Sequence, residues 1–76
     1  MVEAYILLNT ETGKWRSATE EIREYEGIKK IERITGDYDI VILAEAPDIS
    51  TLTETIVEKI HNIEGVTDST TSIIVG

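Results

Sequence analysis

The chain is 76 residues long, with fifteen acidic and seven basic side chains, one histidine, no cysteine and a net charge of −8. A domain of this size hides only about 60% of its unfolded surface, and it has no disulfide and no cysteine to bind a supporting metal, so we expect self-association. The acidic charge argues against a broad nucleic-acid surface, no apolar run approaches the roughly 20 residues of a membrane span, and a start without signal-peptide features predicts a cytoplasmic protein.

Residues 2–9 are apolar at nearly every position, which predicts a strand that is covered on both sides. Residues 10–13 follow as polar turn material, with Thr12 as the expected helix cap. Between residues 14 and 25 the apolar side chains recur at steps of three and four while glutamates fill the other side, which predicts an amphipathic helix. Gly27 is suited to end that helix in a left-handed conformation.

Residues 28–35 carry a weaker pattern, because their isoleucines lie three apart and fit a helix as well as a strand. The position of this segment between Gly27 and the Gly36 turn, and its β-branched residues, favour an edge strand protected by charged side chains. Residues 38–45 contain an unbroken apolar run, which predicts a central strand. The short link at Gly36 predicts a hairpin between the two strands.

The second half repeats the pattern of helix and strand. Asp48 is the expected cap of a second helix, and Gly65 ends it. The helix is predicted by the clearest apolar stripe in the chain, at steps of three and four: Ile49, Leu52, Ile56, Ile60 and Ile63. Residues 66–75 then form a final strand that is rich in threonine and serine.

The resulting order is β-α-β-β-α-β, and Glu26-Gly27-Ile28 is echoed 38 positions later by Glu64-Gly65-Val66. Two such halves predict an α+β, ferredoxin-like domain with a four-stranded antiparallel sheet, strand order 4-1-3-2, and both helices on one face. The uncovered face carries four hydrophobic side chains, for which a second copy of the chain is the simplest cover: Tyr5, Leu7, Val41 and Leu43.

Candidate chemistry is sparse. With no cysteine and with His61 as the only histidine, the sequence predicts no catalytic residues, no metal site and no cofactor. His61 is expected in the last turn of the second helix, where a charged imidazole is favourable. Trp15 is expected to pack in the core or in an interface.

Two polar stretches have both a structural and a functional interpretation. Residues 35–39 place two aspartates and a tyrosine around Gly36, which is typical of a hairpin turn. The same turn offers backbone N–H groups for a carboxylate and an aspartate for an ammonium group, the two charges of a free amino acid. Residues 67–72 form either a polar strand or a row of small hydrogen-bonding groups for a ligand.

Three segments together carry a family resemblance: residues 4–10, the Thr35-Gly36-Asp37-Tyr38-Asp39 turn, and residues 63–66 followed by 69–75. A Gly-x-Tyr-Asp turn before an apolar strand, combined with a Gly-Val pair and a Thr-rich last strand, resembles the C-terminal effector domain of the leucine-responsive regulator/asparagine regulator (Lrp/AsnC) family. This is the RAM domain. The resemblance covers essentially the whole chain and predicts a single domain over residues 1–76.

The resemblance implies a ferredoxin-like fold that dimerises through its sheet and assembles from dimers into larger rings, often octamers. It also implies that a small effector, typically an amino acid, binds between dimers near the turn and the polar last strand. Carried over by position, the ligand-binding residues are Gly36, Asp37, Tyr38, Asp39, Ser69 and Thr71. Ser69 stands where the family more often has threonine, so the hydroxyl is kept and a methyl group is lost.

Full-length members of the family carry an N-terminal helix-turn-helix domain that binds DNA. Because the first predicted strand begins at Val2, we expect a stand-alone effector domain that does not bind DNA itself and that co-assembles with, or modulates, full-length Lrp/AsnC regulators.

Three alternatives stay open. One is a purely structural assembly domain without a ligand, and another is a small ferredoxin-like enzyme of the acylphosphatase or dimeric barrel type. The third is the amino-acid-binding ACT domain, whose effector site needs a glycine after the first strand, where Gly13 is a loose match.

Overall fold

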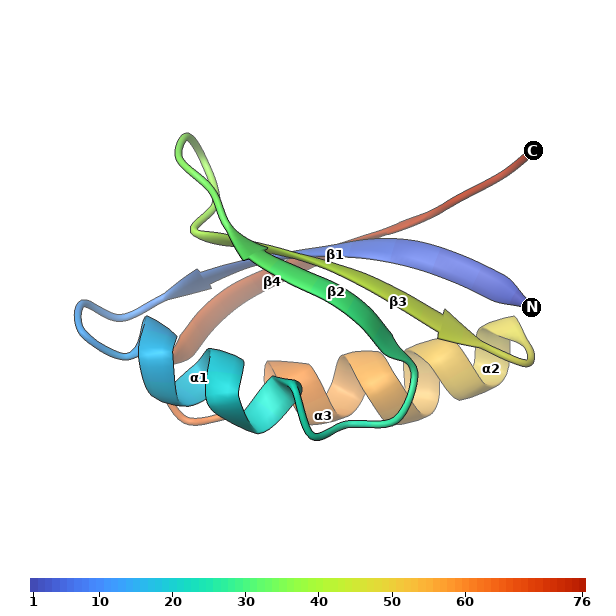
Figure 1. Ribbon diagram of the computed structural model, residues 1–76, viewed down its shortest axis with the longest axis horizontal. Helices are drawn as coiled ribbons and strands as arrows, with labels where there is room; N and C mark the ends of the chain where they lie inside the picture. Colours follow the sequence, from blue (N-terminus) through green and yellow to red (C-terminus); the bar gives the residue numbers. More distant parts are fainter.

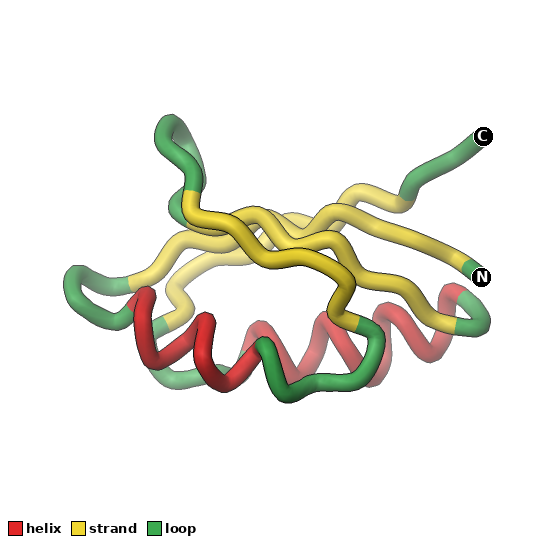
Figure 2. The backbone as a smooth tube through the Cα atoms, viewed as in Figure 1, coloured by secondary structure: helices red, strands yellow, loops and turns green.

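Four antiparallel strands form one sheet, and two helical segments lie on one of its faces (Figures 1 and 2). The computed structural model describes all 76 residues. Its elements are β1 (Val2–Thr10), α1 (Trp15–Ile22), β2 (Ile28–Arg33), β3 (Ile40–Ala46), a second helical segment made of α2 (Ile49–Thr51), η1 (Leu52–Val57) and α3 (Glu58–His61), and β4 (Val66–Ile73). The sheet order is β2-β3-β1-β4, which confirms the predicted ferredoxin-like topology and strand order.

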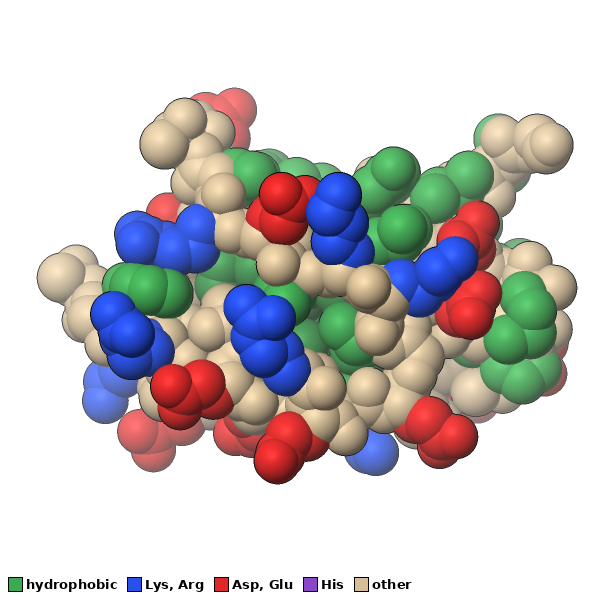
Figure 3. All heavy atoms as spheres, viewed as in Figure 1, with side chains coloured by type: hydrophobic (Ala, Val, Ile, Leu, Met, Phe, Trp, Pro, Cys, Tyr) green, Lys and Arg blue, Asp and Glu red, His purple; other side chains and the backbone are tan.

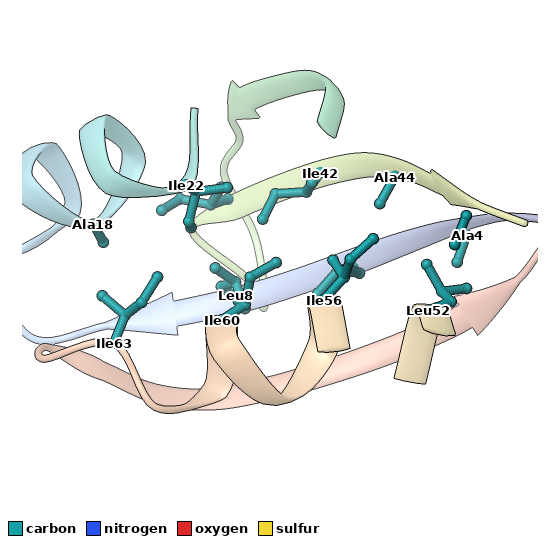
Figure 4. Packing of buried hydrophobic residues seen from close by; sticks show 13 residues of the cluster. Ala4, Leu8, Ala18, Ile22, Ile42, Ala44, Leu52, Ile56, Ile60 and Ile63 are labelled. Carbon is teal, nitrogen blue, oxygen red and sulfur yellow. The ribbon is translucent and has the colours of Figure 1, made fainter. Parts of the chain in front are cut away.

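The core lies between the sheet and the helices, where Figure 4 shows side chains from both layers. Alternate residues of β1 and β3 point to the helix side and are buried, as the period of two requires. They pack against the buried face of each helical segment, for example Ile22 of α1 and Ile60 of α3. The segment 28–35, for which the sequence pattern was ambiguous, contains β2, the strand at one edge of the sheet, as predicted.

The second helical segment begins at the predicted cap: Asp48 Oδ1 accepts a hydrogen bond from the backbone N–H of Thr51 at 2.7 Å. Its middle part, η1, is a π-helix, which the stripe did not indicate. The stripe prediction was wrong at its first position, because Ile49 is 55% exposed, while its other four members are buried. None of the helices is long and apolar enough to cross a membrane.

The start of α1 also differs from the prediction. Lys14, not Thr12, occupies the N-cap position, and no side chain caps the helix. The reason is the turn before it, in which Gly13 has a φ of 81° and the Lys14 N–H donates to the Glu11 carbonyl at 2.9 Å. Thr12 therefore lies two positions before the N-cap and does not cap the helix.

The face of the sheet away from the helices is open. The strand register places Tyr5 opposite Leu43 and Leu7 opposite Val41, so the four predicted hydrophobic side chains share this face. Tyr5 is 47% exposed, and the other three are half-buried. In Figure 3 hydrophobic atoms show along the upper edge, on the side of the sheet opposite to the helices.

Candidate functional site

The turn between β2 and β3 stands up from the sheet on its open side (Figure 1). A hydrogen bond from the Ile34 N–H to the Asp39 carbonyl, 2.9 Å long, closes the loop. At its tip Gly36 has a φ of 115°, a conformation that side chains disfavour. Gly36 and Asp37 are both exposed, so the tip presents backbone and a carboxylate to the solvent.

Asp39 ties this turn to the end of β1 through both its backbone and its side chain. Its N–H donates to the Leu8 carbonyl at 2.9 Å, and its Oδ2 accepts from the Thr10 N–H at 3.0 Å. The pairing of β1 with β3 ends at Leu8 and Ile40. The carboxylate therefore satisfies a backbone donor of β1 that lies beyond the last paired position of this ladder.

Asp37 and Tyr38 are placed differently. The Asp37 carboxylate takes part in none of the side-chain hydrogen bonds or ion pairs of the chain. The Tyr38 hydroxyl lies 2.8 Å from Thr70 Oγ1 of β4, which connects the turn to the final strand across the open side of the sheet. Of the two aspartates, only Asp37 has both oxygens available to a ligand.

Ser69 and Thr71 point to the other side of the sheet. In the register of β4 with β1 they lie opposite Leu8 and Ile6, whose side chains are buried against the helices. Ser69 Oγ is 3.1 Å from His61 Nδ1 of α3. Within one chain the structure thus brings Gly36, Asp37, Tyr38 and Asp39 together with Thr70, and it places Ser69 and Thr71 on the opposite face.

Two contacts at this end of the sheet were not predicted: Thr70 with Tyr38, and the Thr10 N–H with Asp39. The orientation of Thr70 could have been predicted, because side chains alternate along a strand and Thr70, between Ser69 and Thr71, must point to the opposite side of the sheet from them. The bond to Thr10 depends on where the pairing of β1 with β3 ends, and the sequence carries no signal for that position.

The resolved pKa shifts lie away from the turn. Burial, and then the hydrogen bond to Glu21, raise the pKa of Tyr25 to about 12. The hydrogen bond to Glu3 raises the pKa of Lys29, and the Thr51 backbone N–H lowers the pKa of Asp48. No three His, Asp or Glu side chains lie close enough to hold a metal ion.

Comparisons with known proteins agree with the fold. The family model of the Lrp/AsnC ligand binding domain matches residues 3–76. Among solved structures, FFRP-DM1 superposes with a TM-score of 0.92 at 29% identity, covering 99% of this chain and 100% of that one. The transcriptional regulator NMB0573 of Neisseria meningitidis, solved as a complex with L-Met, has the same fold, with a TM-score of 0.83 at 19% identity; 99% of this chain covers 50% of it.

An enzyme also contains a similar segment. The homocitrate synthase of Sulfurisphaera tokodaii is 34% identical over 74 residues, which are 96% of this chain and 16% of the enzyme. The chain thus spans about one sixth of the length of this relative. Because the family model covers nearly all of the sequence and the fold agrees with it, this chain belongs to the Lrp/AsnC ligand-binding domain family, a regulatory ligand-binding type of domain.

Proposed function

We propose that the domain is an amino-acid-responsive regulatory module that binds its effector at the Gly36 turn. The observation that carries this proposal is the exposed Asp37 carboxylate beside the bare backbone of Gly36, in a turn that Asp39 and Tyr38 join by hydrogen bonds to β1 and β4. An ammonium group pairs with Asp37, while the N–H groups of the turn hold the carboxylate. Ser69 and Thr71 belong to the proposed site only if another copy of the chain brings its last strand to this turn.

We further propose that the open sheet face is the dimer interface. It presents Tyr5, Leu7, Val41 and Leu43 on one side of a sheet whose other side is already packed. A standard interface covers about 800 Å² on each partner, roughly one sixth of this chain's 4808 Å² surface. Dimers then assemble into larger rings such as octamers, and the effector binds where dimers meet.

We propose no catalytic activity and no direct contact with DNA, because the net charge of −8 repels a phosphate backbone. The module acts in the cytoplasm on a larger protein. Full-length Lrp/AsnC regulators are the first class of partner, since the family model is that of their ligand-binding domain. The match to part of a homocitrate synthase supports a second class, in which the same kind of domain regulates a metabolic enzyme.

Isothermal titration of the purified chain with each of the twenty amino acids tests effector binding. We expect binding by a small subset, abolished in Asp37→Ala and retained in the matched variant Asp68→Ala, which removes an exposed aspartate of β4. Heat from none of the twenty at millimolar concentration would remove the sensing role and leave an assembly domain without a ligand.

A further inference from the structure

A cavity of about 500 Å³ opens at the opposite end of the sheet from the Gly36 turn, on the helix side. Its walls come from the link between α1 and β2, the link between β3 and α2, and the second helical segment (Figure 1). A neighbouring hollow of about 430 Å³ continues between the helices and shares Tyr25, Thr55 and Lys59 with the first. Volumes of this size are typical of small-molecule sites.

The inner wall of this cavity is apolar and tightly built. Ala46 and Ile56 are buried at its base. Gly27 has a φ of 90°, and a Cβ at this position would lie 2.5 Å from the Glu45 carbonyl oxygen and 2.9 Å from Ile56 Cδ1. The chain therefore presents bare backbone at Gly27, and no side chain from this position can fill the space.

The outer wall is polar. Thr51 and Thr55 flank the cavity from the helical segment, Thr51 just before the π-helix η1 and Thr55 within it. π-helical turns in proteins are frequent at functional sites, because the wider turn changes where side chains project. The Tyr25 hydroxyl donates a hydrogen bond to Glu21 Oε2 at 2.7 Å, so the proton of this hydroxyl is not free for a ligand.

Lys59 is the only basic side chain that lines the two hollows. Its ammonium lies 5.4 Å from the centre of the Tyr25 ring and forms none of the ion pairs of the chain. It is surrounded by carboxylates at the rims of both hollows: Glu21, Glu26, Glu45, Glu54 and Glu58. An anion can pair with the Lys59 ammonium, but the surrounding carboxylates repel it. A zwitterion can pair its carboxylate with Lys59 and its ammonium group with a glutamate.

We propose that this cavity is a second ligand site, separate from the one at the Gly36 turn, and that it takes an α-amino acid with an apolar side chain. The carboxylate pairs with Lys59, the ammonium lies toward the acidic rim, and the side chain packs against Ala46 and Ile56. The shared chemistry, a small carboxylate with an apolar tail, is also found in 2-oxo acids, and the experiment separates the two.

Amide NMR spectra of the ¹⁵N-labelled full chain report both sites at once. L-leucine and 4-methyl-2-oxopentanoate are titrated separately at constant pH. We expect L-leucine to shift the amides of Gly27, Thr51 and Thr55, and the oxo acid to shift them at much higher concentration only. Equal or tighter binding of the oxo acid would overturn the zwitterion assignment.

Lys59→Met tests the proposed carboxylate partner, because it keeps the apolar stem and removes the charge. We expect the affinity measured at Gly27 and Thr55 to fall about tenfold or more, with the spectrum otherwise preserved. The matched control is Lys30→Met, which removes an exposed lysine of β2 outside the cavity.

Gly36 and Asp39 amides serve as reporters of the other site. Shifts confined to them would overturn the second site and leave the proposed function intact. Shifts confined to Gly27, Thr51 and Thr55 would support the second site and remove the turn as an effector site. Unchanged affinity in Lys59→Met would overturn the role given to that ammonium, and an absence of shifts at both ends would overturn both proposals.

Discussion

The two aspartates of the Gly36 turn should separate stability from binding. Asp39 Oδ2 accepts from the part-buried Thr10 N–H at 3.0 Å, while the Asp37 side chain makes no such bond. In Asp39→Ala the Thr10 donor loses its partner, which costs about 1–3 kcal/mol. A loss of 1 kcal/mol lowers the melting temperature of a domain this small by about 4–8 °C, so a fall of at least about 4 °C is expected. Asp37→Ala should stay within about 0.5 kcal/mol of the parent chain.

Thermal and urea unfolding at one fixed protein concentration measure these differences, because the stability of an oligomer depends on concentration. Asp39→Asn is a useful third variant: it keeps an oxygen acceptor for Thr10 and should recover most of the stability that Asp39→Ala loses. The same three proteins are then titrated with the effector, where Asp37→Ala should lose binding. Equal melting temperatures for the two alanine variants would refute the structural role of Asp39, and unchanged binding in Asp37→Ala would refute its role with the ammonium group.

Three further predictions concern packing, assembly and pH. Gly27→Ala should lower the free energy of unfolding by about 2 kcal/mol or more, since a Cβ there meets backbone at 2.5 Å; Gly36→Ala, which meets nothing within 4 Å, should cost less in the same urea titration. Leu43→Asp on the open face should yield monomers in sedimentation experiments, and a full-size oligomer from this variant would exclude that face as the interface. The pKa of Asp48 is lowered on folding, so the stability from this cap is complete above its unfolded pKa of about 3.9 and is lost as the pH falls through the lower folded value. Asp48→Asn keeps an acceptor without the charge, and its stability should therefore fall less than that of the parent between about pH 5 and pH 2; parallel curves would contradict the cap assignment.

The fold was largely predictable from the sequence because its signals are local and repeated. The apolar run from Ile40 and the stripe ending at Ile63 identify a central strand and a helix without any knowledge of their neighbours. The segment after Gly27 was decided by its length and flanking turns, and the structure confirms it as the edge strand β2. Asp48 was recognisable as a cap because its side chain bonds to a backbone N–H only three residues later, so the interaction depends on the local sequence alone.

The features that were missed depend on tertiary geometry. The apolar residues of the second helix have the spacing of an ordinary α-helix. This spacing therefore reveals neither the π-helix η1 nor the exposure of Ile49. The hydrogen bond between Asp39 and Thr10 depends on the position at which the pairing of β1 with β3 ends. The pairing of β4 with β1 decides which side of the sheet Ser69 and Thr71 point to, because side chains alternate along a strand. The family resemblance names these two positions as part of a site between chains, and it does not say on which side of the sheet they lie in one chain.

The cavity beside Gly27 had no sequence signal at all, because its wall residues come from four separate parts of the chain. Glycine at the end of a helix is expected for backbone reasons alone. Only the structure shows that the same glycine is also required by the close approach of the Glu45 carbonyl and Ile56.

Light scattering of the purified chain, with and without a mixture of amino acids, tests most directly whether this domain couples effector binding to assembly. We predict a mass of at least two protomers without ligand, a change in mass when the mixture is added, and an Asp37→Ala protein that keeps the first and loses the second. A monomer under both conditions, or an oligomer whose mass is the same with and without amino acids and whose heat of binding is absent, would contradict the account.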